Sequence, residues 1–416
     1  MLKRVKIKGY KSLMDVEVDL QPLTVLFGPN ASGKSNFLDA LQLLSRIATS
    51  RTLKDAFSPP YRGTPLESFT FGPYGIKDLL AQEKVSLSIE VDIELSLAIV
   101  EKVNREIQAV RGKKTVAEGD KTNSGSNVSY IREKYLRYSI EIEMLPKSGA
   151  LRIANESLTV LGARHQSIQG SVSENPSDSS ILSTPAYRYH TDFPYLVAMR
   201  EELASWYFFY LEPRERMRFP TSVKEVRHIG LMGEELAAFL NTLRALDERQ
   251  FIAVEKALHM FIPSITGIDV NVNNFGEVEL SLMQGQTPIP ARVLSEGTLR
   301  ILGLLALGGA KESPSLLGFE EPENGIHPDR LDLVVLLLKT LTSDDTQVIV
   351  TTHSLTLLDL IPSKSLYVCR QIDGSTDISP FSKWGNEEQK ANRSNTINEG
   401  ETRSVSERLL RGDFNA

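Results

Sequence analysis

The chain has 416 residues and a formal net charge of −6, a length that allows one large domain or two ordinary ones. Hydrophobic residues make up 41% of the sequence and charged residues 24%, a globular balance that can bury a sizeable core. Because the chain is not strongly basic, its composition argues against a nucleic-acid footprint over its whole surface. Any DNA contact would require a local basic patch.

The cysteine content and the hydropathy pattern favour a reducing compartment without membrane contact. Cys369 is the single cysteine, so no internal disulfide can form. No apolar run approaches the roughly 18 residues that a membrane span needs. Residues 1–7 alternate charged and apolar side chains, unlike the continuous apolar stretch of a signal peptide. We therefore expect a cytoplasmic protein.

The first fifty residues predict three strands, a glycine-rich loop and a helix. Residues 5–9 and 16–20 alternate apolar and charged side chains, as in strands with one buried face. Residues 23–27 are almost continuously apolar, which is typical of a strand covered on both faces. After the loop, residues 35–47 place apolar side chains on one side of a helix. The pattern indicates the start of an α/β fold.

The middle of the chain predicts an antiparallel accessory sheet over residues 84–162. Strand-like alternation runs through three stretches, 85–93, 138–144 and 151–161, of which the last is one strand or a pair. Two segments rich in polar residues, 112–129 and 166–185, are predicted as surface loops. They are either sites of partner-specific insertion or, as is more common, inert loops.

The second half predicts further helices and strands. The predicted elements are a buried strand at 206–211, helices at 233–246 and 248–261, and strands at 268–272 and 278–282. No heptad repeat continues over several turns, which excludes a long coiled coil. The end of the chain, residues 386–404, is polar, with a short helix predicted at 405–410.

Residues 28–35 read GPNASGKS and fit the pattern G-x-x-x-x-G-K-[ST]. The glycines allow successive backbone N–H groups to face phosphates, and the following helix contributes its positive end. Lys34 is placed for the β- and γ-phosphates of ATP, and the Ser35 hydroxyl for Mg²⁺. The candidate nucleotide-binding set is completed by Asn30, Ala31, Ser32, Gly33 and Asn36.

A second motif is the predicted strand at 316–319, which ends in two carboxylates. Glu320 is the candidate metal ligand, and Glu321 is the candidate catalytic base that polarises the attacking water. An acidic loop after a strand is common by itself. The phosphate loop in the same chain favours the functional interpretation.

A third motif places His353 at the end of a buried strand over residues 348–352. Ligand sites of α/β sheets lie at the carboxyl ends of strands, so His353 could contact a γ-phosphate oxygen or the attacking water. The alternative is a structural histidine.

A fourth motif, residues 294–298, reads LSEGT and precedes an apolar helix over 299–307. Ser295, Glu296 and Gly297 at the amino end of this helix can form a second anion-binding site. The alternative is that Ser295 only caps the helix.

These four motifs, in this order, resemble the ABC-type ATPase heads of the RecF, structural-maintenance-of-chromosomes (SMC) and overcoming-lysogenization-defect (OLD) group. The nearest likeness is to compact AAA-family ATPases found in bacterial genomes, often in anti-phage loci. In this resemblance 294–298 is the signature motif, 323–328 the D-loop and His353 the switch histidine. Residues 9–12 (GYKS) are similar to an early strand motif that reaches the phosphates, which adds Lys11 and Ser12 to the nucleotide-binding set. Residues 212–214 are the candidate Q-loop.

The resemblance implies a homodimer, or a higher oligomer, closed by ATP. ATP would lie between the phosphate loop of one subunit and the signature of the other, so that Ser295, Glu296 and Gly297 act in trans. ATP binding would close the pair and hydrolysis would open it. One departure is Glu320, where the family has aspartate; its extra methylene shifts the carboxylate by about 1.5 Å and implies slow turnover. Gly318 inside the same strand is also unusual.

The implied fold is an α/β P-loop NTPase of the ABC-ATPase head type. It would have a mixed central sheet, an antiparallel β accessory subdomain and a small helical lobe. The predicted segments are the amino-terminal core (1–83), the accessory region (84–205), a core strand with the helical lobe (206–290), the carboxyl-terminal core (291–385) and a polar tail (386–416).

Three functions remain open at this stage. The resemblance points first to an ATPase subunit of an anti-phage system that controls a separate effector, such as a nuclease or toxin. The second is a RecF-like DNA-repair ATPase, and the third is an ATP-dependent scaffold with little turnover. No long coiled coil and no Toprim nuclease domain are expected, since Asp373 and Asp377 are not surrounded by a buried α/β unit. The basic clusters that could contact DNA are Arg46, Arg51 and Lys54, and Arg132, Lys134 and Arg137.

Overall fold

The computed structural model describes residues 1–118, 130–162, 178–183, 193–308, 314–383 and 404–411. Of the predicted loop at 166–185 only residues 178–183 are described, and of the polar tail at 386–404 only Ser404. Among the helices of the described ranges, none has both the length and the apolar character that a membrane span requires.

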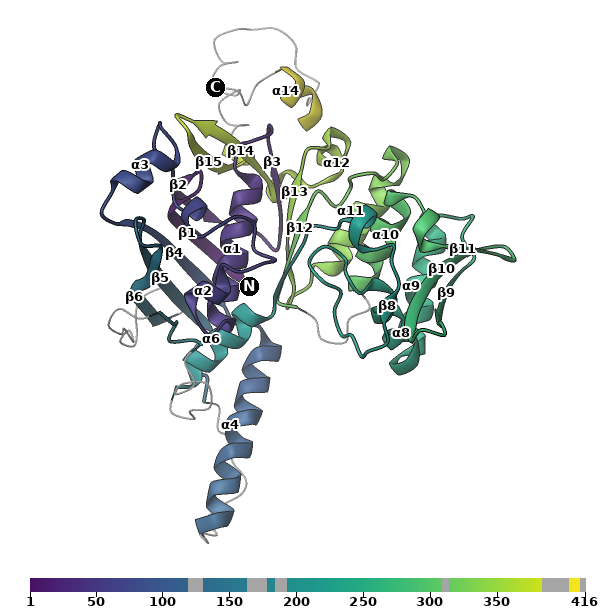
Figure 1. Cartoon of the computed structure of the whole chain (residues 1–416), viewed down its shortest axis with the longest axis horizontal. Coiled ribbons are helices and arrows are strands. Elements are labelled where there is room, and N and C mark those ends of the chain that lie inside the picture. The colour runs from purple at the N-terminus through teal and green to yellow at the C-terminus, as the bar shows by residue number, and fades with distance from the viewer. Residues whose placement is uncertain (119–129, 163–177, 184–192, 309–313, 384–403, 412–416) are drawn as a thin grey trace.

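The centre of the fold is a six-stranded mixed sheet (Figure 1). Its order is β15 (Ser375–Pro380), β14 (Leu366–Ile372), β3 (Leu23–Phe27), β13 (Gln347–Thr352), β12 (Leu316–Glu320) and β7 (Trp206–Phe209). All the strands are parallel except β15, which pairs antiparallel with β14. Every residue of β3 and β13 is buried, as expected for strands covered on both faces.

A five-stranded antiparallel sheet lies beside the central sheet. Its order is β2 (Leu13–Asp19), β1 (Leu2–Tyr10), β4 (Val85–Glu94), β5 (Tyr135–Leu145) and β6 (Ala150–Leu161). Because β1 pairs with β4, with Val5 opposite Val91, this sheet contains strands from both sides of the predicted boundary at residue 83. The stretch at 151–161 forms one strand, not two.

Helix α1 (Lys34–Thr49) packs between the two sheets and is buried almost all round. It contacts β1 of the antiparallel sheet and β7 and β12 of the central sheet, and it packs along α6 (Pro194–Ala204). One apolar core therefore joins the antiparallel sheet, α1, α6 and one face of the central sheet.

The predicted loop at 112–129 is wrong for its first residues, because α4 (Leu97–Glu118) continues through them. Ile99, Val103 and Ile107 are buried at helical spacing, and this part of α4 contacts α6. Figure 1 shows α4 projecting away from the body of the molecule. The glycine and lysines at 112–114 favoured a loop by their composition. The helix nevertheless continues through them from the packed segment that contains Ile99, Val103 and Ile107.

The other face of the central sheet carries a second apolar core and the helical lobe. Both predicted helices of the lobe are present, and Asp247 caps the second by accepting a hydrogen bond from the backbone N–H of Gln250 at 3.1 Å. The elements on this side are α8 (Leu236–Leu246), α9 (Glu248–Phe261), β8 (Thr221–Ser222), β9 (Gly267–Val272), β10 (Glu277–Gln284), β11 (Thr287–Pro290), α10 (Glu296–Leu307), α11 (Leu331–Leu341) and α12 (Leu355–Leu360). The remaining elements are α2 (Leu53–Ala56), η1 (Leu66–Ser68), α3 (Ile76–Ala81), α7 (Pro213–Arg216), η2 (Ala291–Val293), η3 (Pro328–Arg330), η4 (Ser363–Ser365) and α14 (Val405–Arg411).

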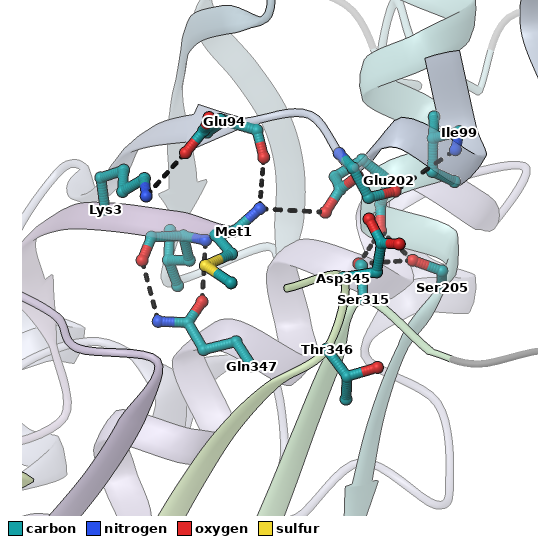
Figure 2. Close-up of polar contacts among 12 residues, drawn as sticks. Met1, Lys3, Glu94, Ile99, Glu202, Ser205, Ser315, Asp345, Thr346 and Gln347 are labelled. Atoms are coloured by element: carbon teal, nitrogen blue, oxygen red, sulfur yellow. Dashed lines mark hydrogen bonds and ion pairs between the residues drawn. The ribbon is translucent and has the colours of Figure 1, made fainter. Parts of the chain in front are cut away.

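A seam of buried polar side chains joins the two large sheets where β1 and β13 begin (Figure 2). Gln347, at the start of β13, accepts from the backbone N–H of Leu2 at 2.8 Å and donates to its carbonyl at 3.0 Å. Glu202 of α6 is 1% exposed and lies 3.7 Å from the amino group of Met1. These contacts fix β1 relative to the central sheet, and β1 leads directly to Lys11 and Ser12.

Candidate functional site

The phosphate loop connects β3 to α1, and its glycines are required by geometry. Gly33 precedes α1 with φ +95°, in the left-handed region, and Ala31 also has a positive φ of +63°. A Cβ on Gly33 would lie 2.0 Å from Oγ1 of Thr376 in β15, so a larger residue does not fit. The first turn of α1 has no side-chain cap, which leaves the amino end of the helix for an anion.

Lys34 is 5% exposed and directs its ammonium group into this loop. Its Nζ donates to the carbonyl oxygens of Gly28 at 2.9 Å and Pro29 at 2.8 Å. Burial lowers the pKa of Lys34, and the nearby carboxylates only partly offset this effect. The loop therefore surrounds a partly desolvated positive charge.

Ser35 and Glu320, the two predicted metal ligands, are in direct contact. Ser35, in the first turn of α1, donates its hydroxyl hydrogen to Oε1 of Glu320 at the end of β12. The described ranges contain no group of three or more His, Cys, Asp and Glu side chains that could hold a metal. A hydroxyl and one carboxylate nevertheless fit Mg²⁺, which prefers hard oxygen ligands and takes few of them from the protein when phosphates supply the rest.

Arg62 is a site residue that the sequence motifs did not identify. Its Nη2 lies 2.8 Å from Oε2 of Glu320 and 3.0 Å from Oδ1 of Asp39 on α1. Its guanidinium group also lies over the ring of Tyr210, 6.0 Å from the centroid. Burial alone would lower the pKa of Arg62, but the two carboxylates outweigh burial and raise it. No spacing or motif marks Arg62, because its partners come from distant elements.

Lys11 and Ser12 lie beside α1 and make separate contacts. Nζ of Lys11 is 2.7 Å from Oδ2 of Asp39, so this charge is paired with a carboxylate on α1. The Ser12 hydroxyl is 2.7 Å from that of Thr376 and accepts from the Asn36 side chain at 2.8 Å. Ser12 thus adjoins the phosphate loop, while Lys11 is held at Asp39, further along α1, and β15 completes this side of the loop.

Glu321 and His353 are brought together by the ends of β12 and β13. Nε2 of His353 lies 3.1 Å from Oε1 of Glu321. Burial and the charge of Lys34 lower the pKa of His353, and Glu321 only partly offsets them, so the imidazole is neutral at neutral pH. Glu321 has a positive φ of +47° and donates its backbone N–H to the carbonyl of Thr351 at 2.9 Å. Such a conformation costs roughly 1 kcal/mol or more, and the ladder to β13 holds it in place.

The signature residues lie on the other side of the central sheet from α1, at the amino end of α10 (Figure 1). Ser295 caps α10 by accepting the backbone N–H of Thr298 at 3.1 Å, and Glu296 pairs with Arg214 at 2.7 Å. A Cβ on Gly297 would lie 2.1 Å from the carbonyl oxygen of Gly325. Within one chain these residues do not join the phosphate-loop site. The candidate Q-loop at 212–214 lies beside them, through Arg214.

A cleft of about 680 Å³ adjoins Glu320, one of the two candidate metal ligands. It lies between α1 and the end of β7, with Asp39, Arg62, Tyr210 and Glu320 among its lining residues. Glu320, Asp39 and Arg62 therefore border an accessible space, whereas Lys34, Ser35, Glu321 and His353 are not among its lining residues.

Two of the basic residues predicted as DNA contacts are engaged within the chain. The Arg46 side chain donates to the backbone carbonyls of Asp55 and Ala56 in α2 and of Ser58 after it, and the contacts to Ala56 and Ser58 are both 2.6 Å. Nε of Arg137 lies 2.6 Å from Oδ1 of Asp92 on the neighbouring strand. Each cluster therefore contains one structural arginine.

The fold, with the phosphate loop between β3 and α1, is that of a P-loop NTPase head of the ABC type. Residues 1–157 match the family model "AAA ATPase domain", and residues 199–359 match "AAA domain, putative AbiEii toxin, Type IV TA system". The chain is similar to a solved SMC head bound to the C-winged helix domain of ScpA. The identity is 13% and the TM-score 0.54, over 91% of this chain and 97% of that one, which supports the fold.

Three curated proteins are similar over shorter segments. The identity is 32% over 93 residues with the chromosome partition protein Smc of Halothermothrix orenii, 43% over 44 residues with the OLD nuclease of Thermus scotoductus, and 40% over 55 residues with RecF of Crocosphaera subtropica. The segments cover 22%, 11% and 13% of this chain, and only 7%, 8% and 14% of those proteins. These findings support an ABC-type ATPase of the RecF, SMC and OLD-like group.

Proposed function

We propose that the chain binds ATP with Mg²⁺ and hydrolyses it at the site formed by the phosphate loop and the ends of β12 and β13. The observation that carries this proposal is the meeting of two pairs from distant segments, Ser35 with Glu320 and Glu321 with His353. The buried charge of Lys34 lies in the loop beside them. An anion-binding helix end, a hard-oxygen pair and a carboxylate–imidazole pair are the groups that phosphoryl transfer to water needs.

Each side chain has a distinct role in this proposal. The loop N–H groups and Lys34 bind the phosphates, with Asn30, Ala31, Ser32, Gly33 and Asn36 as the rest of the loop set and Lys11 and Ser12 beside it. Ser35 and Glu320 would hold Mg²⁺, which neutralises phosphate charge when bound. Arg62 pairs with Glu320 and therefore adds a further positive charge beside this candidate metal ligand.

The carboxylate of Glu321 accepts a proton from the attacking water. His353 lies with its Nε2 atom 3.1 Å from Oε1 of Glu321, and in this proposal that contact orients the carboxylate. The longer side chain of Glu320, in place of aspartate, fits a slow enzyme.

The position of the signature supports a homodimer, or a higher oligomer, with composite sites. Ser295, Glu296 and Gly297 lie across the central sheet from their own phosphate loop, so they would complete the site of a second subunit. ATP would then close the dimer and hydrolysis would open it.

We further propose that this cycle controls a separate effector in anti-phage defence. The family description that names a putative toxin system, and the similarity to an OLD nuclease, support a nuclease or toxin as that effector. The solved SMC head carries a bound domain of another protein, which fits a head that acts on partners. A RecF-like repair function with DNA contact is the second candidate, supported by the RecF similarity. An ATP-dependent scaffold is the third.

Two variants test the chemistry. Lys34→Ala should abolish ATP binding, because the phosphate loop then loses the buried positive charge that Lys34 supplies. Glu321→Gln should retain binding and lose turnover, because the amide cannot accept the proton. ATP binding by Lys34→Ala, or equal turnover by wild type and Glu321→Gln, contradicts the proposal.

A further inference from the structure

Glu323 is a buried carboxylate to which the proposed ATP chemistry gives no role. It follows β12 by three residues and is 8% exposed. Its Oε1 accepts a hydrogen bond from the hydroxyl of Thr352, while no residue in the described ranges gives Oε2 a hydrogen bond. A buried carboxyl group with one unpartnered oxygen lowers the stability of the fold, so stability alone does not explain its position.

The partner of Glu323 controls the backbone on both sides of His353. Thr352 is the last residue of β13 and is fully buried. Its hydroxyl donates to Glu323 and accepts the backbone N–H of Ser354 at 2.9 Å. Ser354 in turn caps α12 by accepting the N–H of Leu357 at 3.3 Å. The residue between Thr352 and Ser354, His353, is therefore attached to a fixed turn.

The same loop also fixes the partner of His353. The carbonyl of Glu321 accepts the backbone N–H of Asn324 at 3.1 Å, and its N–H donates to Thr351 at 2.9 Å. Burial raises the pKa of Glu323, and the hydrogen bond from Thr352 only partly offsets this effect. Glu323 thus contacts the turn that carries His353 while belonging to the turn that carries Glu321.

We infer that Glu323 is a positioning residue, whose carboxyl group acts through Thr352 to set His353 against Glu321. This inference rests on the proposed function, because it assigns His353 and Glu321 to the hydrolytic step. Glu323 itself is not proposed to touch the nucleotide. A displacement of about 1 Å in a catalytic group can cost about 100-fold in rate, so loss of this contact should reduce turnover.

The contact can be removed with little change in side-chain shape. Thr352→Val deletes the hydroxyl, Glu323→Leu deletes the acceptor, and Glu323→Gln keeps one acceptor oxygen. Thr351→Val is the matched control, because that neighbouring hydroxyl is buried and has no hydrogen-bond partner in the described part of the chain. In the full-length chain we expect about 10- to 100-fold lower kcat for Thr352→Val and Glu323→Leu. We expect an unchanged Kd for ATP, and near-normal kcat for Glu323→Gln and Thr351→Val.

A double-mutant cycle separates positioning from a general structural effect. In the His353→Ala background, Thr352→Val should cause no further loss of kcat, because the group that it positions is already absent. If the two losses multiply, or if Thr352→Val behaves like Thr351→Val, the inference is wrong.

A spectroscopic readout makes the result independent of turnover. The ¹³C-labelled His353 imidazole signal, assigned by its loss in His353→Ala, should move in Thr352→Val and Glu323→Leu but not in Thr351→Val. If the wild type fails to hydrolyse ATP and the signal still moves as expected, the proposed function fails while the positioning contact stands. If ATP is hydrolysed and neither signal nor kcat responds to Thr352→Val, the positioning inference alone fails.

Discussion

Gly318, inside β12, is a position where one added methyl group has a calculable effect. An alanine Cβ would lie 2.5, 3.0 and 3.4 Å from three atoms of the Phe208 ring on the neighbouring strand β7. Contacts below 3.0 Å require a shift, and the ring is only 8% exposed. Because Phe208 also borders the cleft, the ring has some room to turn. We therefore expect Gly318→Ala to destabilise the fold by about 1–3 kcal/mol, the range for an overpacked core.

The measurement is the urea midpoint of unfolding, with an unchanged m value if only the folded state is affected. Gly308→Ala is the control, because its Cβ would meet only ordinary contacts of 3.4 and 3.7 Å at a φ of −67°. That variant should be unchanged or up to about 1 kcal/mol more stable. In a Phe208→Val background the loss caused by Gly318→Ala should shrink, since the colliding ring atoms are gone. Equal stability of Gly318→Ala and wild type would refute the packing argument.

Two further predictions concern the charges of the site. Because burial and Lys34 lower the pKa of His353 below that of the unfolded chain, the unfolded chain binds the proton first. The contribution of neutral His353 to the free energy of unfolding is thus present above pH 6.5 and lost as the pH falls below it. If the stability of His353→Ala falls with acid as steeply as that of the wild type, this reasoning is contradicted. Arg62→Ala should cost less than about 1 kcal/mol because the side chain is 53% exposed. Asp39→Ala should lower stability more, because it leaves the largely buried Lys11 ammonium, 14% exposed, without its carboxylate partner. Thermal unfolding that ranks these two variants in the opposite order would contradict the burial argument.

Local patterns predicted the elements whose signal is contained in a few neighbouring residues. The phosphate loop, the apolar strands that precede Glu320 and His353, and the cap at Ser295 each combine a short motif with a strand or helix period. The two helices of the lobe were found for the same reason, and α9 has the predicted bounds. The comparisons confirm the ABC-type ATPase fold that these motifs indicated.

Features that depend on distant segments were not predicted. The pairing of β1 with β4 joins segments separated by more than seventy residues, and no local pattern specifies it. Arg62 acquires its role only from Asp39 and Glu320, which other elements supply. The hairpin of β14 and β15 was missed because its buried run, residues 366–369, is short and polar residues follow it. Thr376 of this hairpin nevertheless closes the phosphate loop.

The central claim is that two chains share each ATP site, and a mixing experiment tests it most directly. Lys34→Ala removes the loop cation, while Ser295→Asp keeps a good helix cap but adds a negative charge where the signature would face phosphates. Each variant alone should be inactive. An equimolar mixture should regain up to about a quarter of the wild-type turnover, because half of the dimers then contain one intact site of two. A mixture that stays inactive, or wild-type turnover by Ser295→Asp alone, would contradict the composite site.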